Sequence, residues 1–174
     1  GLLANYRVTI GGEGTEVLGV VLGPGMLISS AAGAEAGRAG GWYQNFELAT
    51  VTWAPGVGGG AVRGGIREFY FEKNGPETVG YPAKLEVQIG DGWYQDFERG
   101  TVAWSPAGSG FIVGGIRDAY FSYGGPAVLG YPLGAERTHS TGVWIQDFQN
   151  GSVVWSIAGG SAVLQGGLRD VFAA

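Results

Sequence analysis

Apolar and polar positions alternate in short stretches that recur along the chain. In the clearest stretch, Trp93, Gln95 and Phe97 would share one face, while Tyr94 and Asp96 would share the other. A period of two residues is typical of a β-strand with two different faces. The pattern therefore predicts a strand over residues 93–97.

A turn and a return strand follow this stretch. Residues 98–100 read Glu-Arg-Gly, and the corresponding place later in the chain reads Asn150-Gly151, which is a strong hairpin signal. Residues 101–104 would form the return strand. An earlier stretch has Ala49 in place of the turn glycine, so we expect a different turn there. After each hairpin we expect a glycine-rich loop.

A helical period comes after that loop. Ile116, Ala119 and Tyr120 lie at positions i, i+3 and i+4, which predicts a short helix with one apolar stripe. The Gly and Pro residues that follow should end it. We expect the adjacent pair Arg117 and Asp118 to point away from the stripe as exposed charges. The same stripe recurs in Ile66, Phe69 and Tyr70, and in Leu168, Val171 and Phe172.

These patterns recur with a period of 51 residues. Two columns of three tryptophans fix the period and account for all six in the chain: Trp42, Trp93 and Trp144, and Trp53, Trp104 and Trp155. We predict a mainly β fold with short helices, in which three repeats of a β-hairpin and a short helix share one core. The three would form a single domain over residues 1–174, closed into a pseudo-threefold ring or left as an open stack. The bounds are about 7–74, with an insert near 21–39, then 75–124 and 125–174.

Aromatic residues supply the candidate binding site. Tryptophan is large and common in the cores of small repeats, so we expect most of the six to be buried. Tyr43 and Tyr94 would then face outward beside polar groups, as a sugar ring and its hydroxyls require, although a solvated surface role fits them nearly as well. The predicted ligand-binding residues are Tyr43, Gln44, Tyr94, Gln95 and Asp96, with a second column at Tyr81 and Tyr131.

Composition excludes several other functions. The net charge is −5 and the ten Lys and Arg residues are scattered, which argues against nucleic-acid binding. The chain has no Cys, and no apolar run is long enough to span a membrane. His139 is the only histidine, so we expect a surface residue and no metal site, cofactor or catalytic machinery. Residues 56–61 match a dinucleotide fingerprint only weakly, and we expect a turn-rich loop there.

The insert at 21–39 admits two interpretations. It is rich in small residues and contains Met26, Leu27 and Ile28. It would form either a flexible loop or an apolar tip that docks on a partner.

The combined motifs resemble the LGFP repeat family. They are Val-Gly-Tyr-Pro at 79–82, Leu-Gly-Tyr-Pro at 129–132, Tyr-Gln-x-Phe at 43–46 and 94–97, Trp-Ser-Pro at 104–106, and the Gly-Gly-Ile-Arg segments. The first copy departs from the pattern with Val20-Val21 in place of Tyr-Pro, and the third with Ile145 in place of Tyr. The middle copy is therefore the best candidate for an intact site.

The resemblance implies an extracellular, wall-associated module. Members of the family look like cell-envelope modules of mycolic-acid-bearing actinobacteria, often attached to secreted mycoloyltransferases, amidases or peptidases. The leading hypothesis is a non-catalytic module that anchors to wall polysaccharide of the arabinogalactan-peptidoglycan type. The alternative is a structural, self-assembling envelope protein that contacts other protein copies.

Overall fold

The computed structural model describes residues 6–9, 15–19, 22, 26–27, 41–140 and 142–173. The chain divides into two compact units. One contains residues 1–87 and 95–99, and the other contains residues 88–94 and 100–174. Most of the predicted insert lies outside the described residues, except for Leu22 and the short strand Met26–Leu27. The prediction of a single domain stays a prediction, as do the ring and the open stack.

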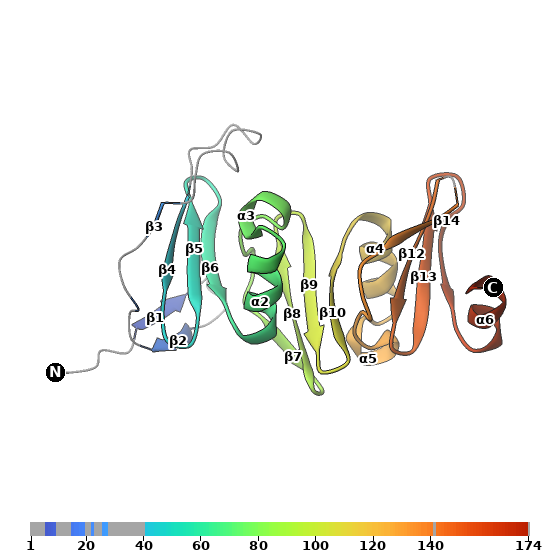
Figure 1. Cartoon of the computed structure of the whole chain (residues 1–174), viewed down its shortest axis with the longest axis horizontal. Coiled ribbons are helices and arrows are strands. Elements are labelled where there is room, and N and C mark those ends of the chain that lie inside the picture. The colour runs from blue at the N-terminus through green and yellow to red at the C-terminus, as the bar shows by residue number, and fades with distance from the viewer. Residues whose placement is uncertain are drawn as a thin grey trace. The chain divides into compact units, whose positions relative to one another are not determined.

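The described residues are mainly β, with short helices (Figure 1). Three antiparallel sheets have four strands each, and β1 (Tyr6–Thr9) pairs with β2 (Thr15–Gly19). The first sheet contains, in spatial order, β3 (Met26–Leu27), β4 (Trp42–Asn45), β5 (Thr50–Ala54) and β6 (Gly58–Val62). The second contains β7 (Val87–Ile89), β8 (Gly92–Phe97), β9 (Gly100–Ser105) and β10 (Gly108–Ile112). The third contains β11 (Arg137–Ser140), β12 (Val143–Phe148), β13 (Gly151–Ser156) and β14 (Gly160–Leu164).

A helix follows the last strand of each sheet. The longer helices are α2 (Gly64–Glu72), α4 (Gly114–Ser122) and α6 (Gly167–Ala173). Short helices α3 (Gly75–Thr78) and α5 (Pro126–Leu129) come after the first two, each with a proline in its first turn, where a missing N–H costs nothing. The predicted hairpin and helix are therefore present, and the same order of elements occurs three times.

The predicted glycine-rich loop was wrong, because each of these segments forms the fourth strand of its sheet: β6, β10 and β14. In β10, a Cβ on Gly110 would lie 2.8 Å from the carbonyl oxygen of Gly134 and 3.0 Å from Nε2 of Gln146. The glycine is needed because the chain of the next copy lies against the strand. Local sequence favours a loop here, but pairing with β9 over Gly108–Ile112 makes the segment a strand.

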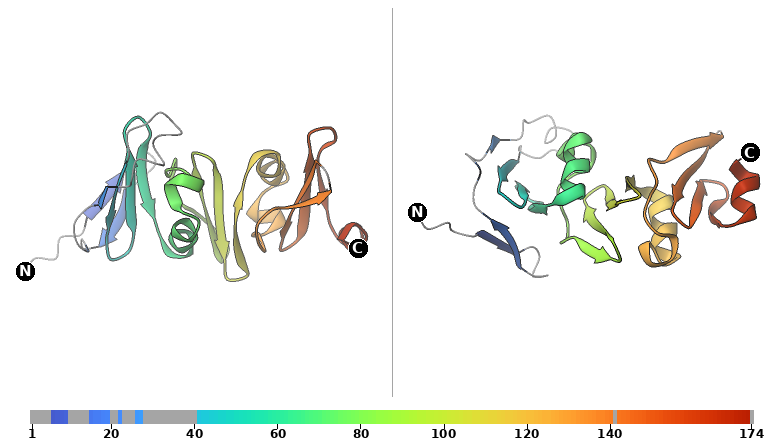
Figure 2. Two further views of the ribbon diagram at one scale, coloured as in Figure 1. Left: turned by 45° about the horizontal axis from the view of Figure 1, so that its top comes forward. Right: turned by 60° about the horizontal axis from the view of Figure 1, so that its bottom comes forward.

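Helix α4 packs against the sheet of the copy that follows it in sequence. It contacts β12, β13 and β14, and it lies beside them in both views (Figures 1 and 2). The predicted stripe of Ile116, Ala119 and Tyr120 is buried, and Tyr120 stacks on Phe148 with ring centroids 4.5 Å apart. In the other unit, Tyr70 of α2 stacks in the same way on Phe97, at 5.2 Å.

The third copy departs from this arrangement. Leu168 and Val171 on α6 are 70% and 79% exposed, so the prediction that this stripe is buried was wrong. In the other two copies, the apolar stripe of the helix packs against residues of a sheet that comes later in the chain. No such sheet faces α6 within the described part of the chain.

The arginine of each longer helix faces its own sheet rather than solvent, which corrects the expectation of exposed charge pairs. The guanidinium Nε of Arg117 donates a hydrogen bond to Oγ1 of Thr101 at 2.7 Å, and Arg67 makes the same bond to Thr50. Helices α2 and α4 are thus each held to the sheet before them by a polar contact. The aromatic contacts described above hold them to residues that come later in the chain.

Candidate functional site

Each sheet carries a pair of tryptophans on neighbouring strands. Trp42 lies directly opposite Trp53, their ring centroids are 5.4 Å apart, and both side chains are 45% exposed. The pairs Trp93–Trp104 and Trp144–Trp155 have centroids 5.7 and 5.4 Å apart and are half-buried. Direct cross-strand contact holds such rings in fixed positions.

The expectation that most tryptophans lie in the core was therefore wrong. In the third copy, the reason is that helix α4 covers only part of the sheet face. Tyr120 covers Phe148 at one end of the sheet face, but Trp155 lies at the start of α4, against Gly115. A Cβ on Gly115 would come within 2.1 Å of Cδ1 of Trp155, so only glycine fits there.

A pocket of about 140 Å³ opens beside the third tryptophan pair. Residues 113–116 at the start of α4, Glu136, Trp144 and Trp155 line it. Burial raises the pKa of Glu136, because charge is less stable away from water. The predicted site did not include these residues. Glu86 precedes Trp93 much as Glu136 precedes Trp144, and this recurrence is the signal that could have pointed to the site.

The predicted tyrosines Tyr43 and Tyr94 face the helix of their own copy. Tyr94 contacts Phe121 of α4 with centroids 5.5 Å apart, and Tyr43 contacts Phe71 of α2 at 6.2 Å. Both are half-buried, so part of each ring is covered by the helix of its own copy.

The second predicted column is buried. Tyr81 and Tyr131 are 6% and 3% exposed. The hydroxyl of Tyr131 donates to the carbonyl of Ile89 at 2.8 Å, and a Cβ on Gly92 would lie 2.4 Å from its ring. Tyr131 thus links two copies, and its ring is closed to a polymer.

Of the predicted polar residues, one is buried and two are partly accessible. Gln95 is fully buried, and its Nε2 donates to the carbonyls of Ala61 and Lys84 at 2.9 and 2.8 Å. Gln44 is half-buried and donates to the carbonyl of Asn45, and Asp96 is also half-buried. Gln95 therefore stabilises the fold, whereas Gln44 and Asp96 remain partly accessible.

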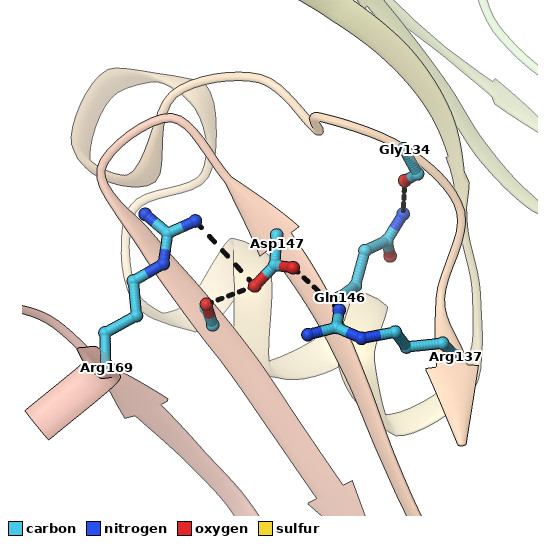
Figure 3. A network of polar contacts seen from close by, with 6 residues as sticks. Gly134, Arg137, Gln146, Asp147 and Arg169 are labelled. Atoms are coloured by element: carbon cyan, nitrogen blue, oxygen red, sulfur yellow. Dashed lines mark hydrogen bonds and ion pairs between the residues drawn. The ribbon is translucent and has the colours of Figure 1, made fainter. Parts of the chain in front are cut away.

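Asp147, the counterpart of Asp96 in the third copy, lies in a network of polar contacts. Oδ1 of Asp147 accepts a hydrogen bond from Ser152 at 2.5 Å and lies 3.8 Å from Arg169, while Oδ2 accepts one from Arg137 at 2.6 Å (Figure 3). Burial alone would raise the pKa of Asp147, but Ser152 and the two guanidinium groups lower it below its ordinary value. The network joins β11, β12, β13 and α6.

Metal-binding and membrane-spanning features do not occur in the parts of the chain that the structure describes. No group of three or more His, Cys, Asp or Glu side chains is placed to hold a metal ion within those ranges. His139 is exposed on β11, as predicted. None of the described helices has the length and apolar character needed to span a membrane.

The LGFP repeat family matches residues 79–127 and 129–174, which together are more than half of the chain. The chain therefore belongs to the LGFP repeat family, and the predicted resemblance is confirmed for two copies. The matches begin at Val79 and just before Gly130, at the buried Gly-Tyr-Pro segments. No curated protein matches the chain.

Proposed function

We propose that this protein is a non-catalytic module that binds cell-envelope polysaccharide of the arabinogalactan-peptidoglycan type through its tryptophan pairs. The observation that carries the proposal is the presence of one partly exposed pair on each sheet, with centroids 5.4 to 5.7 Å apart. Flat aromatic faces with neighbouring hydrogen-bonding groups suit a sugar ring. An attached secreted enzyme domain would be held at the wall by such contacts.

Membership of the family supports this function, because LGFP repeats are typical of extracellular and cell-envelope proteins. The geometry moves the proposed contact surface from tyrosine to tryptophan. Tyr43 and Tyr94, with Gln44 and Asp96, keep a secondary place on β4 and β8 of the first two sheets. A single surface pair binds weakly, but several pairs on one chain raise the effective concentration at the next sugar.

Pelleting with purified wall polysaccharide tests the proposal. The double variant Trp144→Ala/Trp155→Ala removes one pair, and Tyr123→Ala removes an aromatic ring that is 50% exposed and lies in none of the tryptophan pairs. We expect the wild type and Tyr123→Ala to pellet equally, and the double variant to be retained less. If the folded wild type does not pellet with the polymer, the proposal is wrong.

Self-assembly is the second candidate function. Ile157, Leu168 and Val171 are each at least 70% exposed, and apolar side chains this open often contact another chain. Sedimentation velocity at rising protein concentration separates the two functions. Oligomers without wall binding would support assembly, and a monomer that pellets with the wall would support anchoring.

A further inference from the structure

The pocket beside Trp155 has a mixed chemical character. Two indole rings and the backbone at the start of α4 form most of its lining, and Glu136 is the one acidic residue in it. Its volume of about 140 Å³ is close to that of cavities that hold one benzene ring, about 150 Å³. The pocket therefore fits one small group rather than a chain of sugars.

The carboxylate lacks a cationic partner in this place. No hydrogen bond or ion pair reaches Glu136 from the residues that the structure describes. Its neighbour Arg137 is turned to Asp147, at 2.6 Å. Val113 lies at the pocket, where the first copy has Arg63 at the same position of the repeat. Burial raises the pKa of Glu136, as expected of a carboxyl group without a counter-charge.

We propose that this pocket binds a cationic group, a protonated amine or a quaternary ammonium, against the faces of Trp144 and Trp155 and the carboxylate of Glu136. Aromatic rings attract such cations through the negative charge on their faces, most strongly where water is excluded. The carboxylate adds the matching charge. This inference rests on the proposed function and deepens it, because it names the group of the wall polymer that the third pair recognises.

Two probes of equal shape test it. Choline carries a quaternary nitrogen, and 3,3-dimethyl-1-butanol has a carbon atom in its place. Each is titrated into the full chain at constant ionic strength, and amide and indole N–H signals are followed by NMR. We expect choline to shift the signals of Gly114, Gly115 and Trp155 Nε1–H, and to bind about tenfold more tightly than the alcohol.

Single substitutions test whether the carboxylate of Glu136 supplies the negative charge that binds choline. Glu136→Gln keeps the shape of the side chain and should weaken choline binding about tenfold, towards the value for the alcohol. Asp118→Asn removes an exposed carboxylate of α4 outside the pocket and should leave binding unchanged. Trp155→Phe keeps a ring and should weaken binding in part. Equal binding of the two probes, no binding of either, or choline binding that Glu136→Gln does not change would overturn the inference.

The pelleting experiment keeps the two proposals apart. Wall binding by the wild type together with no preference for choline would end this inference and leave the proposed function standing. Choline binding without wall binding would end the proposed function, and with it the assignment of the cation to a wall polymer. Preference for choline together with wall binding that amine hydrochlorides reduce is the result that both proposals require.

Discussion

Two adjacent glycines lie at the start of each of the longer helices, and in α4 they meet different structural needs. Gly114 has φ of +51°, a conformation that other residues rarely adopt. Gly115 has no such requirement, but the indole of Trp155 lies where its side chain would be. The second glycine of the motif is thus specified by a residue 40 positions further along the chain.

Gly115→Ala tests this contact. Alanine is the better helix former by about 0.5–1 kcal/mol. We still expect a loss of stability of about 1–3 kcal/mol, because the added methyl group displaces Trp155. Unfolding by urea, followed by tryptophan fluorescence, measures the change.

Gly167→Ala is the matched control, because it changes the same position of the third copy. A Cβ there would meet nothing within 4 Å, so we expect unchanged or slightly raised stability. An equal loss in both variants would show that the helix start itself, and not the tryptophan, requires glycine.

At this scale the sequence identified which residues share a face, but not how far each face is covered. Trp93, Gln95 and Phe97 alternate as a strand should, yet Gln95 and Phe97 are buried and Trp93 is only half-buried. In the third copy, whose contacts with α4 are described above, the partial exposure of Trp155 arises from where that helix begins, and no local pattern encodes that. The tyrosine site was predicted from the same incomplete information.

A helix stripe is stabilised only where a sheet covers it. Ile116 is 1% exposed, so Ile116→Ala should cost about 2–5 kcal/mol through lost burial and the cavity left behind. Leu168 is its counterpart on α6 and is 70% exposed, so Leu168→Ala should change stability by less than about 0.5 kcal/mol. Chemical denaturation of both variants makes the comparison. A large loss at Leu168 would show that α6 is covered in solution.

The stability of the third sheet should depend on pH because of Asp147. Its pKa is lowered in the folded chain, so the unfolded chain binds a proton more readily. The contribution of Asp147 to stability is therefore complete above the ordinary carboxyl pKa of about 3.9, and it is lost as pH falls through the lowered value.

Asp147→Asn isolates this effect. The variant should be less stable than the wild type at neutral pH, and the difference should shrink towards zero in acid. Urea unfolding at a series of pH values gives the difference at each pH. A difference that stays constant down to low pH would rule out the charge of Asp147 as its source.

The elements themselves were largely predictable, and the misses share one cause. Turn residues and a period of two predicted the hairpins, and apolar spacing predicted α2 and α4. The strand β10 was missed because glycine is a poor strand former. It is present because it pairs with β9 along its length, and Gly110 is required because Gly134 and Gln146 of the next copy lie against it. Contacts between copies carry information that a window of local sequence does not contain.

Binding to a polymer should depend on how many tryptophan pairs remain. Removing Trp144 and Trp155 should reduce retention on long wall polysaccharide by a larger factor than the affinity for an oligosaccharide too short to reach two pairs. The reason is that each lost pair also removes its contribution to recapture of the polymer. Affinity electrophoresis with the polymer and titration with the oligosaccharide measure the two factors. Equal factors would show that the pairs act independently.

At the scale of the whole molecule, the fold class followed from the sequence, because a mainly β chain with short helices is what the repeated patterns describe. The family followed from the motifs around Gly80 and Gly130. How the copies complete one another did not follow. The contact of Tyr131 with Ile89 joins residues 42 positions apart, and neither residue signals it locally.

The residues that line the pocket beside Trp155 come from two copies of the repeat. Residues 113–116 come from one copy, and Glu136, Trp144 and Trp155 come from the next. Neither copy encodes a pocket, so such sites would be counted by junctions and not by repeats. A protein that acquired a single copy would inherit a pair of tryptophans without this pocket, and a duplication inside an existing array would create a new pocket with each junction it adds.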